Sequence, residues 1–338
     1  MKLSWGGFEG AEQLRSLSKR IESIGFDTVA AIETRHDPFV QAAVMVEHTS
    51  RIEVMTTVAV AFARTPMLLA SAAHDLNNLA GGRFILGLGS QTKPHITRRF
   101  SMPWSHPAER MREMIRAIHA IWDAWYDGRQ LDFQGQFYTH TLMTPNFTPT
   151  DIAFGRPQIH LAAVGPHMTE VAAELGDGLL CHSFTSERYL REVTLPAVET
   201  SLVRYGRQRQ NFEVTGIPFI ATGHDAETQE KARAETRRQI AFYASTPSYR
   251  AILDLHGLGA LHEELHTLSK QGRWDEMGNL IDDATLDTFA IVGTPIEAAG
   301  ELRRRFDGLF DRVSLGLGND IQTATELFAS LKSCKSAT

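Results

Sequence analysis

Short apolar runs alternate with amphipathic segments along most of the chain. The first apolar run, residues 2–5, is followed by a segment in which Leu14, Leu17 and Ile21 recur every three to four residues. Side chains at this spacing lie on one face of a helix, and Gly25 is a typical position for that helix to end. The chain therefore begins with a predicted strand followed by a predicted helix.

The same pair of elements recurs through the sequence. Asp37 and Pro38 are typical of the cap and first turn of a helix, and Gly81 is typical of a helix end. Further strands are predicted at residues 26–33, 51–65, 83–89, 158–164, 177–183, 212–223, 289–293 and 312–318. Further helices are predicted at residues 37–49, 66–82, 106–128, 165–176, 186–206, 225–244 and 294–306.

This strict alternation predicts the fold. Strands that alternate with helices form a parallel sheet, because each helix returns the chain to the same edge. We predict that eight such pairs close into an α/β fold of the (β/α)8 barrel type, and that residues 1–338 form one domain. A doubly wound sheet is the alternative. Loops at about residues 90–104 and 130–157 and a helical insertion at about residues 245–285 interrupt the alternation.

The composition and charge exclude several kinds of partner. The 338 residues are 43% hydrophobic and 22% charged, as in a globular enzyme. The net charge is −6 and no basic cluster is present, which argues against nucleic acid or an anionic membrane surface as a partner. The basic runs at residues 231–233 and 303–305 alternate with acidic residues, as on a solvent-exposed helix face.

The sequence shows neither a targeting segment nor a disulfide framework. No apolar stretch approaches the ~18 residues of a membrane span, and the N-terminus lacks the pattern of a signal peptide. Cys181 and Cys334 lie far apart in different settings. We expect a cytoplasmic protein.

Candidate chemistry lies where the predicted strands end, because functional groups of a barrel come from the carboxyl ends of its strands. Gly87 and Gly89 lack the third glycine of a dinucleotide fingerprint and lead into a long loop, so that fingerprint is excluded. They allow a planar ligand close to the backbone, or serve only as barrel corners. Residues 162–170 end a strand and start a helix, which is either an anion site or an ordinary tight turn.

One motif supports a rival hypothesis. Residues 262–266 read HEELH, the pattern that places two zinc-binding histidines on one helix face with Glu263 as general base. The continuation TLSKQG lacks the glycine and third histidine of one large protease class. Signatures of a nucleophile elbow, a P-loop and a C-x-x-C pair are absent from the sequence. A reaction that uses a cofactor and no metal is therefore favoured.

The chain resembles the luciferase-like monooxygenase superfamily, whose members are (β/α)8 flavin and deazaflavin oxidoreductases. The resemblance covers nearly the whole chain and is carried, in this order, by IGFDTVAAIE, RIEVMTTVAVAFARTP, NNLAGGRFILGLGSQ, HLAAVGPHMTEVAAELGDGLLCHS and FAIVGTPIEAA. The stretches TRHDPFVQAAVMVEHTSRIE and RRFSMPWSHPAERMRE are similar to the branch that uses the deazaflavin coenzyme F420. The resemblance also implies a homodimer.

The resemblance gives a meaning to two threonines, Thr56 and Thr57, which interrupt the apolar third strand just before it ends. In this superfamily that strand carries a bulge with a non-prolyl cis peptide bond behind the central ring of the cofactor. Aligning Pro66 places this bond between Thr57 and Val58. A polar side chain beside a bulge can bind backbone groups that leave the sheet, although threonine pairs are also common in ordinary strands.

The same resemblance implies the residues of the site. The implied cofactor contacts are Thr57, Val58, Gly89, Ser90, Ala162, Ala163, Val164, Gly165, Pro166 and His182. Several relatives have glycine where this chain has Val164. The candidate catalytic residues are Glu33, Thr34 and His36, and Thr34 stands where related deazaflavin dehydrogenases often have a histidine base. Lys93, Arg98 and Arg99 either meet the acidic tail of the cofactor or form an exposed basic loop.

The function implied by the resemblance is hydride transfer between C5 of F420 and an organic substrate. Residues 98–104 and the insertion at 245–285 would determine which substrate binds. The first alternative is a two-component monooxygenase that uses reduced FMN and oxygen. The second is a barrel that only binds a flavin.

Overall fold

The computed structural model describes residues 1–7, 11–316 and 320–333. The chain divides into two compact units. Unit 1 comprises residues 1–3, 181–199 and 214–338, and unit 2 comprises residues 4–180 and 200–213. A single domain over residues 1–338 stays a prediction. Cys334 lies outside the described residues.

Unit 2 is built on a parallel sheet whose strands follow one another in chain order. Its strands are β1 (Lys2–Gly7), β2 (Thr28–Ala31), β3 (Glu53–Thr56), β5 (Phe84–Gly89), β8 (Gln158–Ala163) and β9 (Gly178–Cys181), with the short β4 (Ala59–Val60) beside β5. The pairs β1–β2, β2–β3, β3–β5 and β5–β8 are parallel. Strands β2, β5 and β9 are buried along their whole length, as expected of strands covered on both faces.

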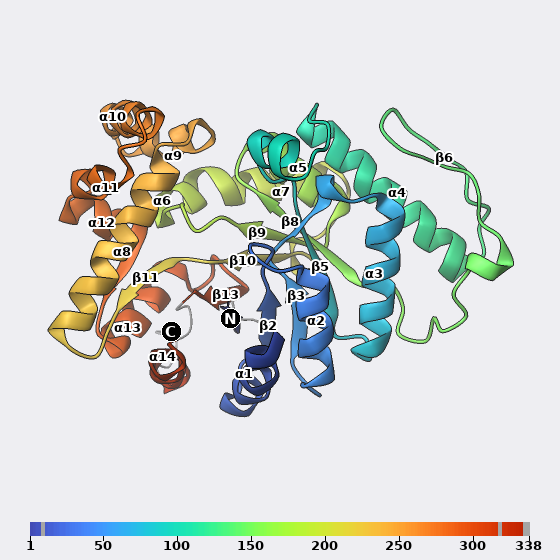
Figure 1. The fold of residues 1–338 in the computed structure, drawn as a ribbon, viewed down its shortest axis with the longest axis horizontal. Coiled ribbons are helices and arrows are strands. Elements are labelled where there is room, and N and C mark those ends of the chain that lie inside the picture. The colour runs from blue at the N-terminus through green and yellow to red at the C-terminus, as the bar shows by residue number, and fades with distance from the viewer. Residues whose placement is uncertain (8–10, 317–319, 334–338) are drawn as a thin grey trace. The chain divides into compact units, whose positions relative to one another are not determined.

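Helices follow these strands in the predicted order (Figure 1). They are α1 (Ala11–Ile24), α2 (Pro38–Glu47), α3 (Pro66–Leu79), α4 (Pro107–Asp127), α5 (Pro166–Leu175) and α7 (Leu195–Arg204). The Asp37 carboxylate accepts hydrogen bonds from the N–H groups of Phe39 and Val40 and so caps α2, with Pro38 in the first turn as predicted. Thr65 caps α3 in the same way.

Unit 1 holds two further parallel strand pairs. Strand β10 (Glu213–Gly216) pairs with β13 (Arg312–Leu315), and β11 (Phe219–Thr222) pairs with β12 (Ala290–Gly293) in a separate two-stranded sheet. The prediction of one continuous strand over residues 212–223 is therefore wrong. Pro218 lies between β10 and β11, and a proline cannot donate a hydrogen bond to a sheet.

The predicted helical insertion is confirmed. After α8 (Ala226–Ala244) the chain forms α9 (Arg250–Leu255), α10 (Gly259–Lys270), α11 (Trp274–Met277) and α12 (Asp283–Phe289). The remaining elements are α6 (Glu187–Tyr189), α13 (Pro295–Phe306), α14 (Ile321–Ser333), β6 (Phe133–Gln134) and β7 (Thr139–His140). Short helical turns lie at residues 61–63, 95–99, 145–147, 190–194, 209–211, 247–249 and 278–280.

The strand order decides the fold class. A doubly wound sheet needs a point at which the strand order reverses, whereas β1, β2, β3, β5, β8 and β9 are neighbours in sequence order without a reversal. The fold is a (β/α)8 barrel, as the sequence predicts.

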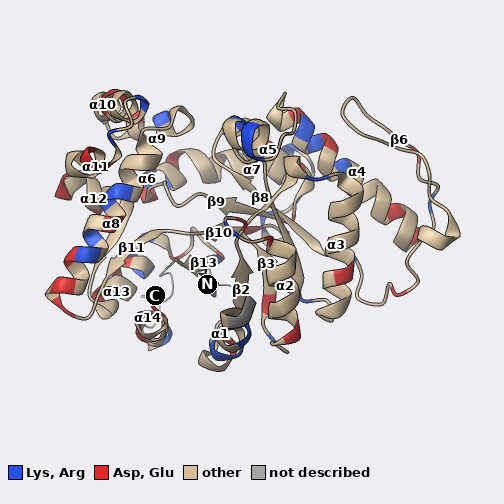
Figure 2. Ribbon diagram, viewed as in Figure 1, with Lys and Arg blue, Asp and Glu red and all other residues tan. Residues whose placement is uncertain are grey.

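The basic runs lie on helix faces and are paired with acids. Arg233 binds Asp283, and Arg304 and Arg305 both bind Glu301. Figure 2 shows basic and acidic residues interspersed along α8 and α13. Lys231 and Arg304 are exposed, whereas Arg233, Arg303 and Arg305 are partly buried, so the predicted solvent-exposed faces are confirmed only in part. Within the described residues, none of the helices has the length and apolar character needed to cross a lipid bilayer.

Candidate active site

The carboxyl ends of three strands of unit 2 form an apolar floor. Its base is a buried cluster of four side chains from four strands: Ala30, Met55, Ile85 and Leu180. Val58 and Ala162 pack on this cluster and are only partly buried. The floor therefore presents Val58 and Ala162 at the end of the sheet where barrel enzymes bind their ligands.

Gly89, at the end of β5, lies between these two side chains. A methyl group on Gly89 would come within 2.6 Å of the Val58 Cγ2 atom and 3.7 Å of the Ala162 Cβ atom. Only a hydrogen atom fits there without displacing Val58. The surface made by Val58, Gly89 and Ala162, called the floor from here on, is thus low enough for a flat group to lie against it.

The threonine pair has two different roles at the end of β3. The Thr56 hydroxyl donates to the Gly87 carbonyl oxygen at 2.7 Å and accepts from the Gly87 N–H at 2.9 Å. The Thr56 side chain therefore replaces sheet hydrogen bonds between β3 and β5, as proposed for a polar residue beside a bulge. The Thr57 N–H donates to the Ala31 carbonyl oxygen, and the Thr57–Val58 peptide bond is cis in the structure.

A buried carboxylate holds the segment that follows the floor. One Glu33 oxygen accepts from the Val60 N–H and from an Arg64 Nη1–H group, both at 2.7 Å. Arg64 also donates to Asp37 at 2.7 Å. Burial opposes the charge of Arg64, but the ion pairs with Glu33 and Asp37 prevail and raise its pKa. Glu33 thus binds the guanidinium of Arg64 and the backbone of β4 at the same time.

The other two candidate catalytic residues lie in the loop after β2. Thr34 and His36 are both exposed. The Thr34 carbonyl oxygen accepts a hydrogen bond from Arg99, and the His36 carbonyl oxygen accepts one from the Gln41 side chain. In the part of the chain that the structure describes, the His36 imidazole has no partner, so of the three candidates it is the titratable group that is free to react. A catalytic role for Glu33, Thr34 and His36 stays a prediction.

Replacing Glu33 by glutamine is expected to cost roughly 3 kcal/mol of folding free energy, because breaking a buried ion pair leaves Arg64 poorly compensated. The Glu33 side chain is only 6% exposed and that of Arg64 16%. Asp37→Asn is the matched control, because asparagine also caps a helix and Asp37 is largely exposed. Urea unfolding should show a much larger loss for Glu33→Gln than for Asp37→Asn. Equal losses would contradict this account.

The start of α5 leaves backbone donors free of side-chain caps. Gly165 is the N-cap residue and makes no side-chain cap, and Pro166 has no N–H to donate. A methyl group on Gly165 would meet no atom within 4 Å. Ala163 is buried, while Val164 and Gly165 are partly exposed beside the helix start. This geometry suits an anion, and the implied phosphate contacts of Ala162 to Pro166 stay predictions.

The loop after β5 carries the remaining polar candidates of unit 2. Ser90 is half-buried, and its hydroxyl donates to the Gln91 carbonyl oxygen. Lys93 and Arg98 are exposed, and no ion pair joins them to another described residue. They are the free cations of the loop.

His182 belongs to unit 1 and follows β9. The Phe184 N–H donates to the His182 Nδ1 atom at 3.0 Å, so the proton of the neutral ring lies on Nε2. Burial lowers the pKa of His182 to about 4. Its ring packs against those of Tyr243 and Tyr249.

Acid is expected to weaken the fold through His182. Burial lowers its pKa from 6.5 to about 4, whereas the unfolded chain keeps the ordinary value. The unfolded chain therefore binds the proton first, and the stabilisation by the neutral ring, complete above the ordinary pKa, is lost as the pH falls through about 4. The loss is at most about 3 kcal/mol. The free energy of unfolding can be measured with urea at neutral pH and near the folded-state pKa. It should fall less between these two conditions for His182→Gln than for the wild type. An equal fall would contradict this account.

Comparison with known sequences decides the family. The sequence profile described as luciferase-like monooxygenase matches residues 4–312. The chain belongs to the luciferase-like monooxygenase family. The predicted resemblance is confirmed, and membership in the luciferase-like family makes the chain an oxidoreductase.

Relatives of this luciferase-like chain include enzymes of known activity. It is 52% identical to an uncharacterized protein from Mycobacterium tuberculosis, over 87% of this chain and 86% of the relative. It is 30% identical to the 5,10-methylenetetrahydromethanopterin reductase of Archaeoglobus fulgidus, over 71% and 70%. The crystal structure of the coenzyme F420 dependent tetrahydromethanopterin reductase from Methanopyrus kandleri matches with a TM-score of 0.78 and 18% identity, over 98% and 96%. This last match supports the fold alone.

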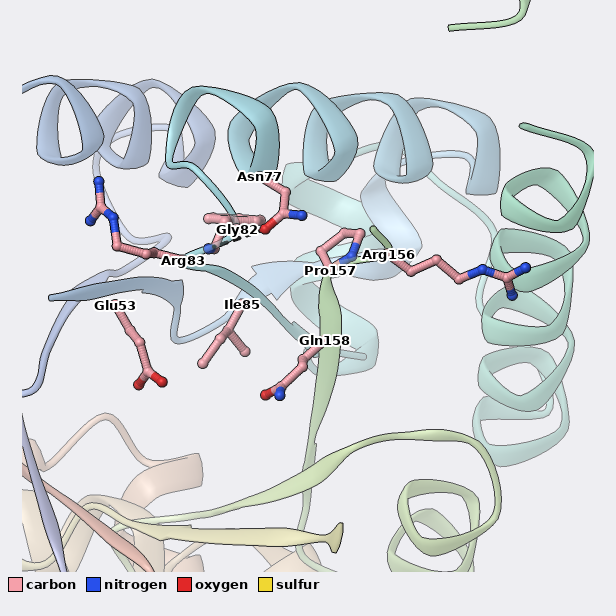
Figure 3. Close-up of a pocket in the computed structure, with 9 residues that line it drawn as sticks. Glu53, Asn77, Gly82, Arg83, Ile85, Arg156, Pro157 and Gln158 are labelled. Carbon is pink, nitrogen blue, oxygen red and sulfur yellow. Dashed lines mark hydrogen bonds between the residues drawn. The ribbon is translucent and has the colours of Figure 1, made fainter. Parts of the chain in front are cut away.

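A small polar hollow lies at the opposite, amino ends of the strands. Residues at the starts of β3, β5 and β8 line it together with residues of neighbouring loops: Glu53, Asn77, Gly82, Arg83, Phe84, Ile85, Arg156, Pro157 and Gln158 (Figure 3). Arg83 donates to the Ile52 carbonyl oxygen, and Asn77 binds the Phe84 N–H and the Gly155 carbonyl oxygen. The hollow thus lies at the end of the strands opposite to the one where barrel enzymes carry their active sites.

Within the described residues, the histidine pair of HEELH finds no third metal ligand, and zinc binding there stays an untested alternative. The His262 Nδ1–H donates to the Ala244 carbonyl oxygen at 2.7 Å, and the His266 Nδ1–H donates to the Ser245 carbonyl oxygen at 2.9 Å. Glu263 binds Arg250. Among the described residues no three metal-ligating side chains come together. The two histidines instead bind carbonyl groups at the C-terminal end of α8.

Proposed function

We propose that the protein is an F420-dependent oxidoreductase that moves a hydride between C5 of the deazaflavin and an organic substrate. The observation that carries this proposal is the floor. It is apolar, it rests on a buried cluster, and Gly89 adds no side chain to it. The Archaeoglobus relative is named a reductase, and the Methanopyrus structure is named as coenzyme F420 dependent, which supports the proposal.

The residues present fit such a cofactor. Val58, Gly89 and Ala162 would contact the flat face of the ring. The uncapped N–H groups of His167 and Met168 at the start of α5 would bind the phosphate, favoured by the partial positive charge of the helix end. Lys93 and Arg98 would meet the acidic tail, because they are exposed cations without an ion-pair partner among the described residues.

When bound, F420 supplies a hydride donor or acceptor carbon, which side chains alone do not provide. The chain would supply position and proton exchange. Glu33 and Arg64 hold the segment from Val58 to Val60 in place. We propose His36 as the proton-exchange group, because its imidazole is exposed and unbound within the described residues. Ligand contact by Ser90, Thr57 and His182 rests on the family resemblance.

Titration of the full chain with F420 and with FMN tests the proposal, using the quenching of tryptophan fluorescence. We expect F420 to bind at least about tenfold more tightly, because FMN ends at its phosphate and gains nothing from Lys93 and Arg98. The double variant Lys93→Ala/Arg98→Ala should weaken F420 binding and leave FMN binding unchanged. Arg15→Ala/Lys19→Ala, which removes two exposed cations of α1, is the control.

Tighter binding of FMN would favour the second candidate, a two-component FMN monooxygenase, which the description of the family supports. Failure of both cofactors to bind would end both proposals. We also propose a homodimer on the basis of the family resemblance, which light scattering after size-exclusion chromatography tests. Cytoplasmic location stays a prediction.

A further inference from the structure

An aromatic cluster in unit 1 surrounds His182 at the end of β9. The centroid of the His182 ring lies 4.5 Å from that of Tyr243 and 4.8 Å from that of Tyr249, and the two tyrosine rings are 5.8 Å apart. Tyr243 is in the last turn of α8, and Tyr249 is in the first turn of the helical insertion. The end of β9 and the short stretch from Tyr243 to Tyr249 thus bring three rings with polar tips into contact.

The polar tips of these three rings are available to a ligand. Over residues 1–7, 11–316 and 320–333, neither the two tyrosine hydroxyls nor the His182 Nε2–H has a hydrogen-bond partner. Each of the three polar atoms also keeps some exposure to solvent. Three donors that are exposed to solvent and bind no described residue are free to donate hydrogen bonds to a ligand.

All three donors are uncharged near neutral pH. Burial keeps the His182 ring neutral by lowering its pKa to about 4. Burial also raises the pKa of Tyr243 and of Tyr249, so both hydroxyls keep their protons. Such donors suit the oxygen of a neutral group better than a carboxylate or a phosphate, which would gain most from a cation.

The walls around these tips are aromatic. Phe184 packs edge-on against Tyr249, and Phe219 lies beside Tyr243; both phenylalanines are buried. These walls therefore suit a ligand in which an apolar or aromatic group carries the oxygen that the three donors would bind.

We propose that His182, Tyr243 and Tyr249 form a recognition site for the carbonyl oxygen of an uncharged, largely apolar substrate. That this ligand is a substrate rests on the proposed function. The three donors would bind its carbonyl oxygen by hydrogen bonds. His182 would then contact the substrate, whereas the sequence assigns it to the cofactor.

The test compares two probes of the same shape on the full chain by isothermal titration. Acetophenone carries a carbonyl oxygen, and α-methylstyrene carries a methylene group in its place. We expect the wild type to bind acetophenone at least about tenfold more tightly, and Tyr243→Phe and Tyr249→Phe each to lower that preference about fivefold, the worth of one hydrogen bond. His182→Gln, which keeps an N–H donor, should retain more of the preference than His182→Leu. Tyr189→Phe, a buried tyrosine outside the cluster, is the control.

Equal binding of the two probes by the wild type, or an unchanged preference in the tyrosine variants, would overturn the proposal. So would a parallel loss of F420 affinity in these variants, which would assign the cluster to the cofactor. A wild type that prefers acetophenone but binds no F420 would refute the proposed function and leave the recognition site standing. The two failures are therefore distinguishable.

Discussion

Gly87→Ala is expected to destabilise the protein by at least about 3 kcal/mol or to prevent folding. A methyl group on Gly87 would lie 1.8 Å from the Thr56 carbonyl oxygen and 3.1 Å from the Leu180 Cδ1 atom. The first of these contacts is with backbone in a buried sheet, which cannot rotate away. The strands β3 and β5 would have to separate, and the two hydrogen bonds between Thr56 and Gly87 would be lost with them.

Urea unfolding followed by circular dichroism measures this loss. Gly300→Ala is the matched control, because a methyl group there meets no atom within 4 Å and Gly300 lies inside α13. Thr56→Val separates the two causes, since it keeps the shape of the side chain and removes only the hydroxyl; we expect it to cost about 2 kcal/mol. A Gly87→Ala protein as stable as Gly300→Ala would show that β3 and β5 do not approach as described.

Gly89→Ala is expected to leave the protein folded and to raise the dissociation constant of the cofactor by roughly ten- to a hundredfold, a loss of about 1.4 to 2.7 kcal/mol. The added methyl group would lie 2.6 Å from the Val58 Cγ2 atom, so Val58 must move. Val58 is only partly buried and has room to move away from the cluster below it. Its displaced side chain would then project from the floor into the place of the ring.

Fluorescence titration of the variant with F420 or FMN measures this effect, again with Gly300→Ala as the control. The double variant Gly89→Ala/Val58→Ala supplies the sharper test, because it removes the side chain that the new methyl group displaces. We expect the double variant to recover a large part of the affinity. A Gly89→Ala protein with unchanged affinity, or a double variant without recovery, would show that the floor does not contact the cofactor.

Much of the fold is readable from the sequence, because each strand and helix depends on contacts between near neighbours in the chain. The alternation of elements, the cap at Asp37 and the helical insertion are all local patterns. The split of the seventh strand was also readable, since Pro218 interrupts the run. The apolar pattern continues on both sides of that proline, which is why a single strand is predicted there.

The hydrogen-bond and ion-pair partners of the candidate site residues could not be predicted from local patterns in the sequence. Glu33 and Arg64 are separated by more than twenty positions, and neither residue type nor spacing indicates that they bind each other. The oddity of the threonine pair was visible, but only the structure shows that Thr56 binds Gly87 while Thr57 does not. Tyr243 and Tyr249 carried no signal, because tyrosines in an amphipathic segment resemble ordinary core residues.

The histidine pair of α10 has a consequence for how substrate choice can change. By gripping the carbonyl groups of Ala244 and Ser245, it anchors the short stretch of chain that presents both Tyr243 and Tyr249. Mutations elsewhere in the insertion can thus change the residues around these hydroxyls, while the two histidines hold the hydroxyls in place. Loss of these two hydrogen bonds would free both tyrosines at once. The two imidazoles therefore fix the positions of both proposed substrate contacts together.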